Sequence, residues 1–220
     1  MTTTAKNSTK PRQITPQYPP MLPSGVSNFH KLITHRNKEG NAYLFVDKSL
    51  FIRDFLNAGD EITLITRPRR FGKTLTLSML EHFLAPAVNG QSTKGLFEGL
   101  QISKYPKIMK DQGQYPVIFL TLKEAKGQRF EEIFARIKEV IYRLFKTHLY
   151  LLTDGNLTEE DSINFKKMLN KTATQAVYKG ALHLLSQLLY EYTGKKVYIL
   201  LDEYAPHKPC VSTWMLRTLP

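Results

Sequence analysis

The sequence contains one cysteine, Cys210, and this scarcity excludes several classes of structure. A single thiol can form neither an intrachain disulfide nor a zinc site built from cysteines. Chains with so few thiols are typical of reducing compartments, so we expect a cytoplasmic protein. The chain also lacks any apolar run near the roughly 20 residues of a transmembrane helix, and we expect no membrane partner. The six histidines show no spacing typical of metal ligands.

Acidic residues are scarce relative to basic ones. The 31 Lys and Arg outnumber the 19 Asp and Glu, giving a formal net charge of +12. This excess favours a partner that carries phosphate, such as a nucleotide, a nucleic acid or an anionic surface, although a solvated basic surface explains it equally well. Hydrophobic residues make up 42% of the chain, enough for the packed core of one domain.

The first 22 residues lack both acidic side chains and an apolar secretory segment. Prolines at 11, 16, 19 and 20 prevent a regular helix, and few residues there could join a core. We therefore expect residues 1–22 to form a disordered tail. A transit peptide is the weaker alternative, because the segment lacks an amphipathic stripe rich in arginine.

From residue 23 to residue 204 the hydrophobic pattern predicts alternating strands and helices. Strands are expected at 61–66, 115–122 and 195–204, with a shorter one in the first half of 41–60. Helices are expected at 49–59, from Lys73 to Pro86, and at 129–152, 158–170 and 174–194. Such an order predicts an α/β fold with a mainly parallel sheet flanked by helices.

The stretch ITRPRRFGKT, residues 65–74, lies between the first of these strands and a helix. A phosphate-binding loop needs a glycine where the backbone approaches phosphate, an ammonium group for the β- and γ-phosphates, and a hydroxyl for Mg²⁺. Gly72, Lys73 and Thr74 supply these groups in order. The nucleotide-binding residues expected from this pattern are Arg67, Pro68, Arg69, Arg70, Phe71, Gly72, Lys73, Thr74 and Leu75.

The loop departs from the usual pattern G-x-x-x-x-G-K-[ST] at one position, because Arg67 stands where the first glycine belongs. Arginines beside a phosphate loop can hold phosphate oxygens with paired hydrogen bonds. Their alternative role is to face water or to pair with a structural acid. Three arginines in so short a loop would repel one another without an anion between them, so we expect at least one near the nucleotide.

The run VYILLDEY places Asp202 and Glu203 at the end of a strongly apolar strand. In phosphate-loop ATPases such a strand ends in an acid pair. The aspartate holds Mg²⁺, usually through water, and the glutamate activates the attacking water. We therefore expect Thr74 and Asp202 at the metal and Glu203 as the catalytic base. A strand that simply ends in solvated acids is the alternative.

These segments together resemble the AAA-ATPase-like domain proteins, P-loop proteins that often carry a C-terminal PD-(D/E)-x-K nuclease-like domain. The resemblance rests on LPSGVSNFHKL, YLFVDKSLFIRDFL, ITLITRPRRFGKTLTLSMLEHFL, LFEGLQI, YPVIFLTLK and YILLDEY, which occur in the family's order. It implies that RPRRFGKT is the family's own variant of the loop and that Arg67 is an ordinary member of it. It also implies an ATP-binding domain over residues 23–204.

The chain departs from that family after Tyr204. Ala205 stands where an aspartate is usual, and residues 206–220 hold three prolines, the only cysteine and the only tryptophan. We expect residues 205–220 to be an irregular tail of a C-terminally truncated member. The family's later strands, including one between the loop strand and the acid-pair strand, would then be missing from the sheet.

The function expected from the sequence is ATP binding with Mg²⁺, and ATP hydrolysis in the intact family, with activity reduced in a truncated chain. An alternative is a pseudo-ATPase or basic module that contacts nucleic acid or a protein partner. A further alternative is a gene fragment that does not fold stably. The sequence contains no motif that distinguishes ATP from GTP, and it leaves the oligomeric state open.

Overall fold

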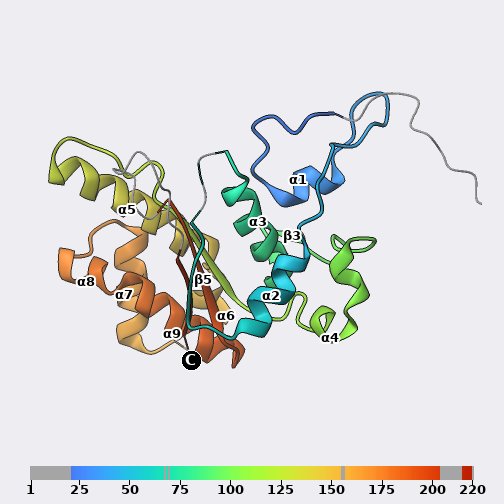
Figure 1. The fold of residues 1–220 in the computed structure, drawn as a ribbon. Helices are drawn as coiled ribbons and strands as arrows, with labels where there is room; N and C mark the ends of the chain where they lie inside the picture. Colours follow the sequence, from blue (N-terminus) through green and yellow to red (C-terminus); the bar gives the residue numbers. More distant parts are fainter. Residues whose placement is uncertain (1–20, 67, 69, 155–156, 204–214, 220) are drawn as a thin grey trace, which may run out of the picture.

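A four-stranded sheet lies between two layers of helices in the computed structural model of the chain (Figure 1). The structure describes residues 21–66, 68, 70–154 and 157–203, together with the backbone of 215–219. The strands of this sheet are β1 (Ile62–Leu64), β4 (Val117–Thr121), β5 (Val197–Asp202) and β6 (Met215–Leu219). Their order across the sheet is β1-β6-β5-β4. The α/β class expected from the sequence is therefore the class observed.

The pairing of the strands differs from the mainly parallel sheet that was expected. Among the described strands of this sheet, only β4 and β5 pair in parallel, whereas β6 pairs antiparallel with both β5 and β1. Since β1 and β5 both run opposite to β6, the strands β1, β5 and β4 all point the same way. Their carboxyl ends consequently meet at one edge of the sheet.

The expected gap in the centre of the sheet is filled. The segment Met215–Leu219 was expected to belong to an irregular tail, but it forms β6 between β1 and β5. A strand in this place gives hydrogen-bond partners to two edges that would otherwise be exposed. The expectation of a missing central strand was therefore wrong, although the strand that fills the place is antiparallel. The remaining residues of that expected tail lie outside the described part of the chain.

Two hydrophobic cores cover the two faces of the sheet. The helices are α1 (Phe29–Thr34), α2 (Leu50–Ala58), α3 (Lys73–Leu84), α4 (Pro106–Met109), α5 (Phe130–Thr147), α6 (Tyr150–Asp154), α7 (Glu159–Leu169), α8 (Gln175–Lys179) and α9 (Ala181–Thr193). Helices α5 to α9 lie on one side of the sheet and α1 to α4 on the other (Figure 1). Alternate residues of β5 enter the two cores, Val197 and Ile199 on one side and Tyr198 and Leu200 on the other.

Several expected helix ends are confirmed by their caps. Gly59 ends α2 in the left-handed conformation, and the hydroxyl of Thr158 accepts a hydrogen bond from Asp161 N at 3.1 Å at the start of α7. The expected helix at 129–152 is interrupted at His148, and the one at 174–194 is divided at Gly180. The expected strand within 41–60 is reduced to isolated bridges that involve Ala42 and Tyr43.

The structure adds short elements that the pattern did not predict: α1, α4, the 3₁₀ helix η1 (Gln101–Lys104) and the hairpin of β2 (Ala87–Val88) and β3 (Gln91–Ser92). Within the described residues, no helix combines the length and apolar character that crossing a membrane requires.

Candidate functional site

The candidate site lies at the sheet edge where β1, β5 and β4 end. The loop from Thr66 to Gly72 leaves β1 there and leads into α3. Asp202 is the last residue of β5 and is paired with Thr121, the last residue of β4. Leu64 of β1 pairs with Met215 of β6, and Met215 pairs in turn with Leu201 of β5. The loop that follows β1 therefore begins about two strand spacings, roughly 10 Å, from the acid pair at the end of β5.

The loop reaches α3 through two residues in the left-handed region. Arg70 has φ 67° and Gly72 has φ 72°, and Gly72 occupies the N-cap position of α3. A Cβ atom added to Gly72 would meet nothing within 4 Å among the described residues. A glycine is therefore needed at position 72 because the backbone there is left-handed. The sequence had instead led us to expect that glycine leaves space for the phosphate. Arg70 and Phe71 are exposed, and the expected contacts of Arg67 and Arg69 lie outside the described residues.

The ammonium group of Lys73 is directed back along the loop. Lys73 is only 8% exposed, and its Nζ donates a hydrogen bond to the carbonyl oxygen of Pro68 at 3.0 Å. This bond draws the start of α3 and the middle of the loop together. The amide groups of the first turn of α3, which have no partner inside the helix, point toward the same region. A cation and a helix N-terminus at one place favour an anionic ligand.

Asp202 is buried in a setting that opposes its negative charge. It is 4% exposed, and its Oδ1 is buried with no hydrogen-bond partner among the described residues. Burial, and to a smaller extent the neighbouring Glu203 carboxylate, raise the pKa of Asp202 to about 6. The hydroxyl groups of Thr74 and Thr121 and the ammonium of Lys123 act in the opposite direction. A buried carboxylate with an unused oxygen is suited to a cation.

The donor set fits a magnesium ion held jointly with a phosphate ligand. Mg²⁺ takes oxygen ligands and is usually bound by one or two carboxylates, waters and substrate phosphates. Asp202 offers the unused carboxylate oxygen and Thr74 a hydroxyl. In the described part of the chain, no group of three or more His, Cys, Asp or Glu could hold a metal alone. These residues would therefore bind Mg²⁺ only together with phosphate oxygens.

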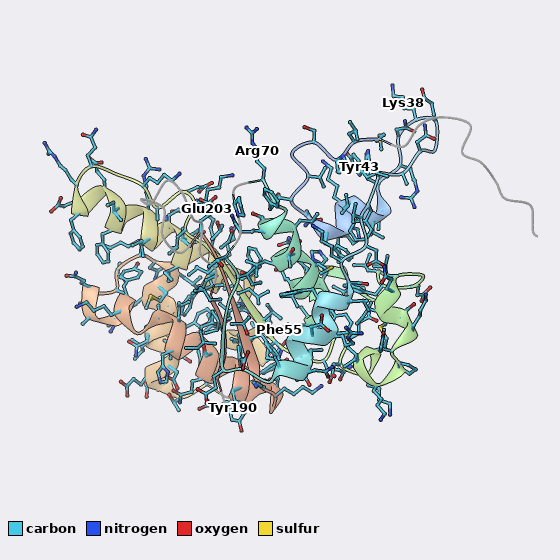
Figure 2. The ribbon with its side chains drawn as sticks, in the orientation of Figure 1. Lys38, Tyr43, Phe55, Arg70, Tyr190 and Glu203 are labelled. Carbon is cyan, nitrogen blue, oxygen red and sulfur yellow. The ribbon has the colours of Figure 1, made fainter. Side chains whose placement is uncertain are left out.

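Glu203 follows Asp202 with a backbone conformation that is rare for a glutamate. Its φ is 56°, and the residue is half-buried. Such a conformation costs on the order of 1–2 kcal/mol for a residue with a Cβ atom, and strained residues of this kind cluster at functional sites. Figure 2 shows Glu203 and Arg70 at the same end of the molecule.

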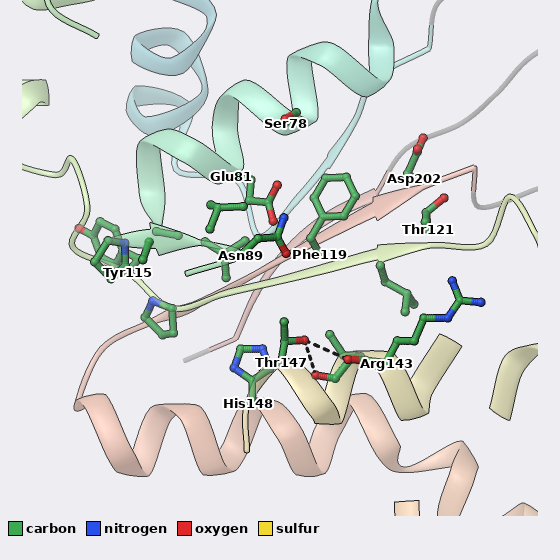
Figure 3. A pocket seen from close by; sticks show the side chains of 18 of the residues that line it. Ser78, Glu81, Asn89, Tyr115, Phe119, Thr121, Arg143, Thr147, His148 and Asp202 are labelled. Carbon is green, nitrogen blue, oxygen red and sulfur yellow. Dashed lines mark hydrogen bonds between the residues drawn. The ribbon is translucent and has the colours of Figure 1, made fainter. Parts of the chain in front are cut away.

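A cavity of about 1200 Å³ begins at this edge and continues along α3 and β4. Thr74 and Asp202 line its first part, and Ser78 and Glu81 line it further along α3. Figure 3 shows Ser78 and Glu81 on one side of β4, and Arg143, Thr147 and His148 on the other. The far part of this cavity was not anticipated from the sequence.

A second cavity of about 190 Å³ lies against another face of α3, next to the loop. Its lining is Pro23, Phe29, Leu32, Leu44, Phe45, Val46, Lys48, Gly72, Leu75, Thr76 and Met79. Asp47, which precedes Lys48 of this lining, accepts hydrogen bonds from Ser49 N and Gln101 N, at 2.8 and 2.7 Å.

Two residues of the second cavity stand out in the structure by their exposure. Leu44 is 49% exposed and Val46 is 70% exposed, although both are aliphatic. The sequence marks this segment only by its apolar and aromatic residues, which were interpreted as a strand. Apolar groups that remain exposed beside a phosphate-type loop indicate a surface that a ligand can cover.

The chain was compared with known families, curated proteins and solved structures. A sequence profile of the family described as "Predicted AAA-ATPase" matches residues 23–216. An "Uncharacterized protein in vnfD 5'region" from Azotobacter chroococcum mcd 1 is 37% identical over 81 residues. That match covers 37% of this chain and 13% of the relative, so the chain corresponds to a small part of that protein. No solved structure matches.

The family match covers most of the chain, including the loop, Thr74, Asp202 and Glu203. It supports nucleotide binding at a coarse level and agrees with the resemblance found in the sequence. On this basis, the chain belongs to the family of predicted AAA-ATPases.

Proposed function

We propose that the chain binds Mg²⁺–ATP at the carboxyl edge of its sheet and that this site hydrolyses ATP. The observation that carries this proposal is the buried Oδ1 of Asp202, which has no hydrogen-bond partner among the described residues. Asp202 ends β5 and lies beside Thr74 in the first turn of α3, the helix that follows the basic loop. A buried carboxylate of this kind is stabilised when a cation joins it. Family membership supports the nucleotide as the ligand.

Each group of the loop has a separate role in this proposal. The ammonium of Lys73 leaves or shares its bond to Pro68 O and holds the β- and γ-phosphates, as the loop amides hold phosphate oxygens. Arg70, with Arg67 and Arg69, adds guanidinium groups around the phosphates, and Phe71 and Leu75 flank them. Thr74 and Asp202 hold Mg²⁺, which when bound neutralises phosphate charge and polarises the γ-phosphoryl group.

Glu203 is the proposed base for hydrolysis. Its carboxylate would orient a water molecule and accept a proton from it as the water attacks the γ-phosphorus, while the bond from that phosphorus to the bridging β-phosphate oxygen breaks and ADP leaves. The purine base is proposed to occupy the second cavity, because that cavity is largely apolar and adjoins Gly72 and Thr76 at the loop. This placement does not distinguish adenine from guanine.

The first test is ATP binding by a Lys73→Ala variant. We expect at least about tenfold weaker binding, because a hydrogen bond to a charged group contributes roughly 1.5–3 kcal/mol. Titration of a fluorescent ATP analogue measures the affinity, and thermal unfolding checks that the variant folds. Lys107→Ala, at an exposed lysine of α4, is the matched control and should keep the affinity. Full ATP affinity in Lys73→Ala would refute the site.

The second test separates hydrolysis from binding. Glu203→Gln should slow ATP turnover by about 100-fold or more, the usual contribution of a general base, while ATP affinity remains within about threefold. Phosphate release measures turnover, and Glu98→Gln at an exposed site is the control. Turnover that persists in Glu203→Gln would remove the proposed base but leave the binding site in place.

A further inference from the structure

Among the described residues, the outer edge of β4 has backbone groups without a strand partner. β4 is the terminal strand of the described sheet, so only its edge toward β5 is paired there. On that edge Pro116 O accepts a hydrogen bond from Tyr198 N at 3.1 Å, and Leu122 N donates one to Asp202 O at 3.0 Å. Backbone groups alternate in direction along a strand. Val117, Phe119 and Thr121 therefore point their N–H and C=O groups away from β5.

The large cavity runs along this edge. It is lined by Phe119 and Thr121 on the face of β4 toward α3, and by Leu120 on the opposite face. Residues of α3 and of α5 border it on the two sides (Figure 3). A cavity that touches both faces of one strand must enclose that strand's edge. Its volume of about 1200 Å³ exceeds the roughly 300–1,000 Å³ of an ordinary small-molecule pocket.

The shape of this place favours an extended chain over a second copy of the domain. The β4 edge is recessed between α3 and α5, which both line the cavity. A second copy would have to bring its own β4 to the same place, and that strand is recessed between the same two helices. A single extended segment needs only the width of one strand, about 4.8 Å. Strand addition of this kind is a common mode of peptide recognition.

Glu81 lines the cavity with a carboxyl group that forms no ion pair with a lysine or arginine among the described residues. Its side chain is 20% exposed, and its Oε2 lies 4.0 Å from His82 Nδ1. That nitrogen is already 2.7 Å from the carbonyl oxygen of Ser78, and burial lowers the pKa of His82, so the ring is neutral at pH 7. Burial raises the pKa of Glu81 to about 7. A cation close to the carboxyl group would lower this pKa again.

Two of the basic side chains that line the same cavity already have ion-pair or hydrogen-bond partners. The guanidinium of Arg143 lies 3.0 Å from Glu124 and 3.5 Å from Glu139. The ammonium of Lys195 donates to Gln114 Oε1 at 2.9 Å. Neither makes a recorded ion pair with Glu81 in the described part of the chain. A basic side chain on an incoming segment would therefore supply the charge that Glu81 lacks.

We propose that an extended segment of a partner protein binds in this cavity, adds a strand to β4 along Val117, Phe119 and Thr121, and places a lysine or arginine against Glu81. Thr121 lies at the end of β4 beside Asp202, so the segment would end next to the candidate nucleotide site. The proposal does not depend on nucleotide binding, since the edge and Glu81 are present without it.

The test uses a short peptide, acetyl-Thr-Val-Lys-Val-Thr-amide, titrated without nucleotide and followed by NMR. We expect the amide signals of Val117, Phe119 and Thr121 to shift and to gain protection from hydrogen exchange. Replacing the peptide lysine by norleucine should weaken binding about tenfold, as expected for a charge-assisted hydrogen bond. Methylating the backbone nitrogens that pair with β4 should abolish binding at about 1 mM peptide.

Protein variants then locate the charge. Glu81→Gln should bind the lysine and norleucine peptides alike, whereas Glu98→Gln should keep the preference for lysine. Absence of binding at about 1 mM, or binding unaffected by backbone methylation, would overturn the proposal. A dimer of the free chain that the peptide dissociates would overturn it in favour of a second copy. Loss of ATP binding in Lys73→Ala tests the nucleotide site separately and leaves this result unchanged.

Discussion

Asp202 combines two properties that make its ionised form unfavourable in the folded chain. It is almost fully buried, and one carboxylate oxygen has no partner among the described residues. Its pKa is raised from 3.8 to about 6, with burial as the main cause. Between these two values the folded state binds more protons than the unfolded state. Ionisation of Asp202 therefore lowers the free energy of unfolding as pH rises through that range. This penalty is absent below the range and complete above the range.

Asp202→Asn should consequently stabilise the chain at neutral pH in the absence of nucleotide and metal. A shift of this size corresponds to at most about 3 kcal/mol at pH 7, and the gain should vanish as pH falls toward 4. Chemical unfolding of both proteins between pH 4 and pH 8 measures the difference. Asp60→Asn at an exposed position should show no such pH dependence. A gain equal at all pH values would contradict the titration of Asp202 as its cause.

Helix α3 links the site to the rest of the domain through its middle as well as its start. Ser78, one turn after Thr74, is 4% exposed, and its Oγ accepts a hydrogen bond from Phe29 N at 3.0 Å. Phe29 begins α1 and is fully buried against Phe97, with ring centroids 5.0 Å apart. A single buried hydroxyl thus fixes the start of α1 on the helix that carries Lys73 and Thr74.

Ser78→Ala should destabilise the chain by about 1–3 kcal/mol, because it leaves the buried amide of Phe29 without its acceptor. Chemical unfolding measures the free energy of unfolding. The substitution should accelerate hydrogen exchange at the Phe29 amide more than at the amides of α5. Ser24→Ala, at an exposed serine near the same segment, is the control and should change stability by less than about 0.5 kcal/mol. An unchanged Phe29 amide would show that this bond does not hold α1.

The sequence predicted elements whose signals are local. The strand before the loop, the helix after it and the start of a helix at residue 158 follow from nearby residues, and all three are present. The interruption after Thr147 was missed because the apolar stripe continues through it. Fully buried Leu151 belongs to the same core, and α6 packs against α9 after a change of direction. Gly180 did carry a signal for the break between α8 and α9, since glycine weakens a helix interior.

At the scale of the molecule, the sequence predicted a shared site for Thr74 and Asp202, which remains a prediction, but it could not predict the strand that connects β1 to β5 in the sheet. β6 has five residues in a segment rich in proline, and its pairs are with residues far away along the chain. Short strands depend on their neighbours more than on their own composition. The second cavity was missed for a similar reason, because residues 23–48 meet α3 only in the folded chain.

β6 is also the element on which the geometry of the site depends. In the described sheet β1 pairs with β6 alone, so β6 holds the loop strand at its distance from β5. Leu216 pairs with Thr63 on one side and with Leu200 on the other. A proline there cannot donate to either neighbour and does not fit a central strand.

Leu216→Pro should therefore separate β1 from the sheet. Each buried backbone group left without a partner costs about 1–3 kcal/mol, so we expect lower stability together with at least about tenfold weaker ATP binding. Thermal unfolding and titration of a fluorescent ATP analogue measure the two effects. Leu216→Val keeps the backbone donor and should retain both properties. Leu216 belongs neither to the loop nor to the acid pair. ATP affinity that survives in a folded Leu216→Pro chain would therefore mean that the loop binds nucleotide without its place in the sheet.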